Sequence, residues 1–164
     1  MIAKNLRDLF VEELHDIHDA EKRLIIALPK MVKAANSSEL RAAFEKHLKQ
    51  TEEHVTRLAS VYESIDESPM AKTCKAMVGL LEEGDELMRQ EGPPSVRDAA
   101  LVAAAMKVEH YEMATYSCLR LWADILDEED AEKLLRKSFD DEVSADKALM
   151  SIAKTLHEET VKSR

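Results

Sequence analysis

Polar side chains of metal-binding type occur where helical periodicity would place core residues. In four long segments, apolar residues recur at steps of three and four and are interrupted near the middle. The interrupting carboxylate and imidazole residues are Glu21, His47, His54, Glu109, Glu112, Glu142 and Asp146. No Lys or Arg lies in the same stripes. Buried together, five carboxylates would repel one another, so several must be protonated or bound cations must neutralise them.

A pair of divalent or trivalent cations is the simpler of these two solutions. Carboxylate oxygen combined with imidazole nitrogen suits iron or manganese, and zinc also accepts these ligands. We therefore expect two metal ions, with iron as the first choice. Neither Cys74 nor Cys118 lies among the interrupting residues, which argues against an iron–sulfur cluster.

Sparse turn-forming residues divide the chain into helices. Breaks occur around residues 36–38, 66–69, 91–95 and 127–130. Ser38 and Ser95 are the expected N-caps of the helices that follow two of these breaks. The predicted helices span residues 3–35, 38–65, 70–91, 95–126 and 129–160.

The lengths of the connections predict the topology. Short links join the first two long helices and the last two, and short links between long helices produce antiparallel hairpins. The segment at about 66–95, with its shorter helix, can carry the chain back along the molecule. We therefore expect an all-α, ferritin-like four-helix bundle with a crossover helix, forming a single domain over residues 1–164.

The two predicted hairpins place the polar interruptions at one level. Pairing around the first turn sets Glu21 between Thr51 and His54. Pairing around the second turn brings two acidic pairs level with each other, namely Glu109 and Glu112 with Glu142 and Asp146. All four long helices thus contribute to one polar layer.

Composition narrows the class of protein. The chain has 164 residues and a net charge of −10, which argues against a nucleic-acid partner and against binding to an anionic membrane surface. No apolar run approaches the ~20 residues of a membrane span, and the N-terminus lacks an apolar signal core. We expect a cytoplasmic protein whose two cysteines are reduced, buried thiols.

Several segments resemble the YciF-like stress proteins of the ferritin-like superfamily. The resemblance rests on Asp19-Ala20-Glu21-Lys22, His47-Leu48-x-x-Thr51, Arg97-Asp98-Ala99-Ala100-Leu101, Val108-Glu109-His110-Tyr111-Glu112 and Asp141-Glu142-x-x-x-Asp146. It implies a dimetal centre, di-iron in the first instance, in a bundle like that of rubrerythrin, and a role in stress. Rubrerythrins carry two Glu at i and i+3 on the third bundle helix and a bridging Glu 33 residues after the first of them, a pattern that Glu109, Glu112 and Glu142 match.

Two positions depart from the superfamily pattern. Thr51-x-x-His54 replaces the usual Glu-x-x-His, with His47 one turn before Thr51. Asp146 takes the place of the second histidine ligand. The sequence leaves open whether His47 or His54 supplies the nitrogen ligand. There is no Cys-x-x-Cys module, so the electron donor is unknown.

The sequence predicts a di-iron carboxylate protein, either a ferroxidase or a protein that reduces O₂ or H₂O₂. In this hypothesis Glu142 bridges the metals, and the terminal or additional bridging ligands are Glu21, Glu109, Glu112 and Asp146. Two Fe(II) ions would deliver two electrons to the oxidant. The alternative is a non-catalytic helical-bundle interaction or structural protein, with or without a structural metal. A homodimer is expected in either case.

Other residues of these types have simpler interpretations. Tyr116 lies in a stripe one turn from Glu112, where it either packs or donates a hydrogen bond to a ligand carboxylate. The histidines expected at the surface are His15, His110 and His157.

Overall fold

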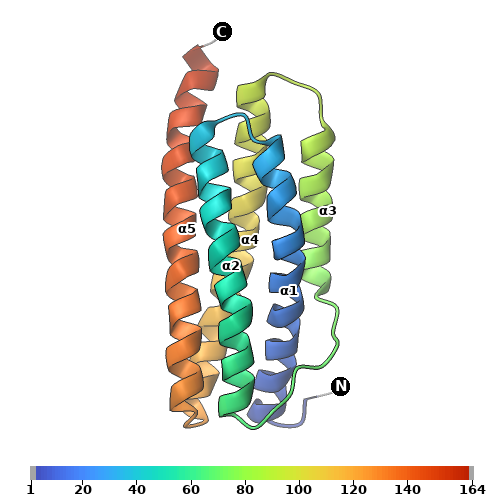
Figure 1. The fold of residues 1–164 in the computed structure, drawn as a ribbon, viewed down its shortest axis with the longest axis vertical. Coiled ribbons are helices and arrows are strands. Elements are labelled where there is room, and N and C mark those ends of the chain that lie inside the picture. The colour runs from blue at the N-terminus through green and yellow to red at the C-terminus, as the bar shows by residue number, and fades with distance from the viewer. Residues whose placement is uncertain (1–2, 163–164) are drawn as a thin grey trace.

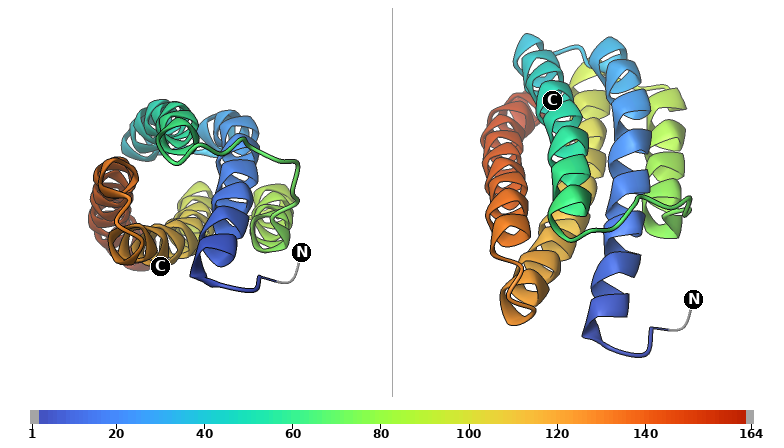
Figure 2. Two further views of the ribbon diagram at one scale, coloured as in Figure 1. Left: turned by 90° about the horizontal axis from the view of Figure 1, so that it is seen from below. Right: turned by 60° about the horizontal axis from the view of Figure 1, so that its bottom comes forward.

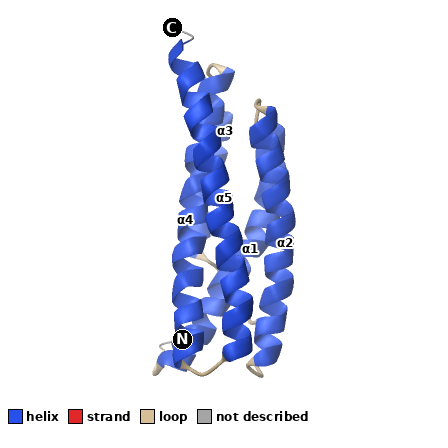
Figure 3. Ribbon diagram, turned by 90° about the vertical axis from the view of Figure 1, so that its left-hand side faces the viewer, coloured by secondary structure: helices blue, strands red, loops and turns tan. Residues whose placement is uncertain are grey.

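The computed structural model describes residues 3–162, with side chains as far as Leu156. Every regular element in this range is an α-helix (Figure 3). The helices are α1 (Leu6–Ala34), α2 (Ser38–Ser64), α3 (Lys75–Arg89), α4 (Pro94–Ile125) and α5 (Glu129–Lys162), shown in Figure 1. The all-α prediction is confirmed for the described residues, and each predicted helix is present with its ends shifted by a few residues.

The chain forms two antiparallel hairpins joined by a long crossover (Figure 1). Helix α1 packs against α2 and α4, while α5 packs against α2 and α4. The four long helices therefore surround one core, and α3 lies outside it beside α1 and α4 (Figure 2). None of the described helices combines the length and the apolar character that a membrane span requires.

Apolar residues fill both ends of this helical bundle. On α1, Phe10, Leu14 and Ile17 are fully buried below the middle, and Leu24 and Leu28 are buried above it. Similar pairs of apolar stretches occur on α2, α4 and α5. Burial of these side chains supplies the main driving force for packing the helices together.

The crossover helix begins later than its sequence predicts, at Lys75 rather than at residue 70. Cys74 is the N-cap: its Sγ accepts a hydrogen bond from the Met77 amide at 3.3 Å, and its own amide donates to Asp19 Oδ2 at 2.8 Å. Lys72 reaches Glu12 on α1, 2.9 Å away. Contacts with α1 therefore decide where α3 starts, and these contacts are not encoded in the local pattern.

Several single-residue predictions were wrong. The N-cap of α2 is Ser37, whose hydroxyl accepts from the Leu40 amide, and α4 begins at Pro94 without a side-chain cap from Ser95. Cys118 is exposed, because its face of α4 points away from the core.

Among the histidines expected at the surface, His15 is buried, while His110 is exposed as predicted. The His15 ring stacks on Tyr62, and its Nδ1 forms a 2.9 Å hydrogen bond with the Tyr62 hydroxyl. The side chain of His157 lies outside the described residues.

A buried carboxylate fixes the turn between α1 and α2. Asp98, on α4, is only 2% exposed. Its Oδ1 accepts from the Asn36 amide at 2.8 Å, and its Oδ2 accepts from the Ser37 amide at 2.7 Å. One side chain thus satisfies two backbone donors of the turn and joins the first hairpin to the second.

We expect Asp98→Ala to lower the free energy of unfolding by about 1–3 kcal/mol, because the two backbone amides of the turn lose their buried, charged acceptor. Urea denaturation would measure this as a lower midpoint with an unchanged slope. The matched control is Asp124→Ala, at an exposed acid on the same helix, which should change stability by less than about 0.5 kcal/mol. Equal effects of the two substitutions would contradict this role for Asp98.

Candidate metal centre

Six of the seven residues predicted as metal ligands come together in the middle of the bundle. They form two groups with ligand atoms within 4.8 Å of one another. The first group is His47, Glu109, Glu112 and Glu142, and the second is Glu21, His54 and Glu142. All six side chains are buried, and they come from α1, α2, α4 and α5. Because Glu142 belongs to both groups, its carboxylate lies between two adjacent candidate metal positions.

Both histidines of α2 point into this layer. They are seven residues apart, two helical turns, and therefore lie on one face of the helix. His47 Nε2 lies 3.2 Å from Glu109 Oε1 and 3.9 Å from Glu142 Oε2. His54 Nδ1 lies 3.1 Å from Glu21 Oε1 and 2.9 Å from Glu142 Oε1. Each group thus contains one imidazole, His47 in the first group and His54 in the second. The sequence alone left open which of these two histidines supplies a nitrogen ligand.

An outer carboxylate orients the ring of His54. Asp141 Oδ2 lies 3.4 Å from His54 Nε2 and accepts a hydrogen bond from Arg57 Nη1 at 2.7 Å. Gln50 donates to the other oxygen of Asp141 at 3.3 Å. This arrangement leaves His54 Nδ1 facing the buried carboxylates, as carboxylate–histidine pairs do around metal ions.

The roles of Asp141 and Arg57 were not predicted from the sequence. Asp141 stands in a run of acids and looks like a solvated residue. One signal could have identified Asp141 as a partner of the candidate ligands. It directly precedes Glu142, and it lies on the side of α5 that faces α2.

Tyr116 and Thr51 make hydrogen bonds at the edge of the site. The Tyr116 hydroxyl donates to Glu21 Oε1 at 2.5 Å, so this tyrosine holds a candidate ligand. The other oxygen of Glu21 makes no hydrogen bond within the described residues. Thr51 donates to the backbone oxygen of His47 at 2.9 Å and thus bonds within its own helix.

Asp146 lies outside both groups. Its Oδ1 is 3.1 Å from Nε2 of His110, whose side chain is largely exposed. This pair sits at the surface of the α4–α5 hairpin, with the Asp146 side chain 20% exposed. Asp146 contacts none of the other candidate ligands in this structure, and its predicted role as a metal ligand stays a prediction.

The site concentrates the buried polar atoms that lack a hydrogen bond. Ten such side-chain atoms occur among the described residues, and eight of them belong to this layer. Six of the eight are carboxylate oxygens of Glu21, Glu109, Glu112 and Glu142, and two are the ring nitrogens of His47. Buried acceptors without donors cost free energy, and a bound cation is the partner that suits a group of carboxylates. Four carboxylates would also balance the charge of two divalent ions.

Burial and mutual repulsion shift the pKa values in the layer. Burial, followed by the charge of Glu142, raises the pKa of Glu109 and Glu112 well above 4.5, and burial also raises that of Glu21. Burial opposes protonation of His54, but Glu21 and Glu142 raise its pKa to about 10.

The remaining two residues shift in the other direction. Burial lowers the pKa of His47. Burial would raise the pKa of Glu142, but the adjacent imidazoles of His54, 2.9 Å away, and His47 hold it below its ordinary value. Without metal, these shifts favour the protonated forms of Glu21, Glu109 and Glu112, and they favour a charged His54 beside an ionised Glu142.

These shifts predict how pH affects the metal-free protein. In the folded chain Glu21, Glu109 and Glu112 keep protons that the unfolded chain releases above about pH 4.5. His54 acts in the same direction, because its pKa is 6.5 in the unfolded chain and about 10 in the folded chain. The free energy of unfolding should therefore fall as pH rises through this range. Metal binding requires these protons to leave, so stabilisation by metal should grow over the same range.

Thermal unfolding between about pH 5 and pH 9, with Mn²⁺ and with a chelator, would test this. The difference in Tm between the two conditions should widen as pH rises. Glu112→Gln mimics the neutral carboxyl, so it should flatten the pH dependence of the metal-free protein with little loss of stability at neutral pH. A Tm difference that narrows with pH would contradict this assignment of charges.

The chain is similar to known proteins over nearly its whole length. The chain is 39% identical over 154 residues to Protein YciF of Escherichia coli (strain K12), covering 93% of each chain. The crystal structure of the E. coli stress protein YciF matches with a TM-score of 0.93 at 38% identity, over 95% of this chain and 99% of that chain.

Two further solved structures are similar. YcfI of Rhodopseudomonas palustris, described as a candidate structural protein, matches with a TM-score of 0.87 at 35% identity, over 89% of this chain and 93% of that one. A protein from Xanthomonas campestris matches with a TM-score of 0.75 at 16% identity, over 96% and 97% of the two chains, a likeness that shows the fold alone.

The resemblance noted in the sequence is thus confirmed. The family described as a domain of unknown function, DUF892, matches residues 5–162, nearly the whole chain. The chain therefore belongs to the DUF892 family and is a homologue of YciF.

Proposed function

We propose that this protein binds two metal ions, iron in the first instance, in a ferritin-like four-helix bundle. The observation that carries the proposal is the set of eight buried ligand-type atoms without hydrogen bonds, gathered around Glu142. Di-iron proteins of the ferritin-like class build their centres from inward-facing Glu and His residues on all four bundle helices. The present donor set, four Glu and two His, has the same composition.

The two metal positions would have different protein ligands. The first would be held by His47, Glu109 and Glu112, and the second by His54 and Glu21. Glu142 would bridge the two positions. Tyr116 would hold Oε1 of Glu21 and leave Oε2 for the metal, while Asp141 would keep Nδ1 of His54 turned inward.

The chemistry we propose is oxidation of iron by O₂ or H₂O₂. Two Fe(II) ions supply two electrons, which with two protons convert H₂O₂ into two water molecules or O₂ into H₂O₂. The chain's own residues would hold the metals, with Glu142 serving both positions, and would exclude bulk water by burial. Because the similar YciF is a stress protein, we propose that this reaction serves a stress response.

A structural role is the second candidate. It is favoured by YcfI, which is described as a candidate structural protein, and by apolar packing that holds both ends of the bundle independently of the polar layer. A metal in this case would serve stability alone. The expected homodimer fits both candidates and stays a prediction.

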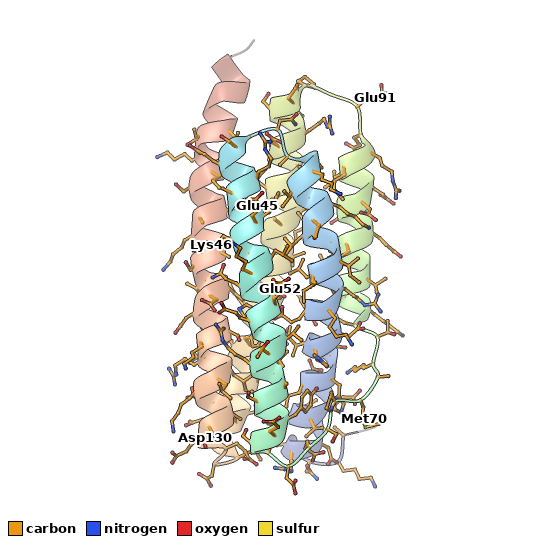
Figure 4. The ribbon with its side chains drawn as sticks, in the orientation of Figure 1. Glu45, Lys46, Glu52, Met70, Glu91 and Asp130 are labelled. Carbon is orange, nitrogen blue, oxygen red and sulfur yellow. The ribbon has the colours of Figure 1, made fainter. Side chains whose placement is uncertain are left out.

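Metal stoichiometry separates these candidates. Chelator-stripped protein titrated anaerobically with Fe(II) should bind about two ions per chain. Glu142→Ala should lose both ions, because its carboxylate serves both positions, whereas Glu21→Ala should lose only the ion held with His54. The control is Glu45→Ala at an exposed glutamate of α2, which should bind iron like the unchanged chain (Figure 4).

Addition of O₂ or H₂O₂ to the loaded protein then tests the reaction. Ferric absorbance should appear with the unchanged chain and the Glu45→Ala variant, and it should be absent from Glu142→Ala. Tight metal binding that raises Tm, with no oxidation faster than free Fe(II), would favour the structural candidate. Failure of the chain to bind any metal would reject the dimetal proposal.

A further inference from the structure

A small cavity opens between α2 and α5 and ends at the candidate metal centre. Its volume is about 30 Å³, enough for one small molecule, since a cavity needs roughly 10–15 Å³ to hold a water. At its inner end lie His47 and Glu109, which belong to the first metal position. At the other end Lys46 lies exposed, on the side of α2 next to α5 (Figure 4).

The inner end of the cavity carries ligand-type atoms that lack a hydrogen bond. His47 is 5% exposed and Glu109 is 2% exposed. Neither ring nitrogen of His47 makes a hydrogen bond within the described residues, and Oε2 of Glu109 makes none either. A molecule in this cavity would therefore lie directly beside the first metal position.

The cavity exists because a short side chain stands where a longer one would fit. In ferritin-like di-iron bundles a His follows a ligand Glu at i+3 on two of the helices. Three residues after Glu142 this chain has Ala145, which lines the cavity. Ala43 on α2 lines it from the opposite side. Both candidate imidazoles, His47 and His54, come from α2, so the centre would not need a histidine at position 145 of α5.

The lining favours an uncharged molecule. Methyl and other hydrocarbon groups of Ala43, Phe44, Ala145 and Leu149 form most of the wall, and transferring an ion into such surroundings is costly. The positive charge of Lys46 at the opening also repels metal cations. An uncharged species of two oxygen atoms fits both the size and the chemistry.

We propose that this cavity admits the oxidant, O₂ or H₂O₂, to the His47 side of the centre, and that metal ions enter by another route. The inference rests on the proposed function and adds the class of molecule and the direction from which it reaches the metals. It assigns Ala43 and Ala145 as the residues that keep the route open.

Filling the cavity tests the proposal. Ala145→Leu and Ala43→Leu close it from opposite helices, so the conclusion does not depend on the folding of a single variant. The control is Ala42→Leu, which adds the same group at an exposed position next to Ala43 and outside the cavity. Each protein is loaded with Fe(II) without oxygen, and bound iron is counted first.

Three measurements follow on each loaded protein. Nitric oxide, an uncharged diatomic probe, is titrated and its association followed by absorbance. Oxidation rates are then measured separately with O₂ and with H₂O₂. Ferricyanide, which oxidises without entering the cavity, gives the reference rate.

We expect both filled variants to bind iron and to react with ferricyanide within twofold of the unchanged chain. Nitric oxide association and oxidation by O₂ or H₂O₂ should slow at least tenfold, and the oxidant slowed more is the one that uses the cavity. Ala42→Leu should change none of these rates.

Unchanged nitric oxide, O₂ and H₂O₂ rates in both filled and iron-loaded variants would overturn the proposed route while leaving the dimetal centre in place. Loss of iron by both filled variants would also overturn it, because the alanines would then support the centre itself. If the unchanged chain binds no iron, the proposed function fails and this route fails with it.

Discussion

Carboxylates buried away from water must be paired, protonated or bound to a cation, and four of them share the middle layer of this bundle. The surrounding residues offer too few donors to satisfy them, as the unpartnered oxygens show. A metal-free chain can bear this arrangement only by holding protons on several of the glutamates. A chain with two divalent ions gives up those protons and gains coordination instead. The chemistry that we propose depends on that exchange.

Contacts outside the polar layer fix the positions of the helices that carry its side chains. Apolar side chains fill both ends of the bundle and stabilise it by their burial. The polar layer therefore lies between two apolar regions whose packing does not depend on it. Asp98 ties the turn of the first hairpin to α4, and Cys74 with Asp19 fixes the crossover against α1. These contacts set the relative height of the helices, on which the distances between ligand atoms depend.

The level of the polar layer could be predicted from the sequence because helical rise is constant and both hairpin turns are short. That geometry sets Glu21 between Thr51 and His54, and the structure shows that His54 is the residue it contacts. The rotation of each helix about its own axis is harder to predict. Around the axis of α5, Ala145 lies about 60° to one side of Glu142 and Asp146 lies about 40° to the other side. A small rotation of the helix therefore decides which of these two residues faces the polar layer. Packing against α2 and α4 sets that rotation, and it turns Asp146 toward His110. The late start of α3 escaped prediction for a similar reason, since contacts distant in sequence determine it.

The sharing of Glu142 between the two groups has a consequence for how the protein is made. Glu142 lies on α5, and the other five candidate ligands precede it in the chain. A nascent chain still lacking α5 has an incomplete donor set at both positions. In the proposed dimetal centre, metal capture would therefore await the docking of α5 against the other three long helices.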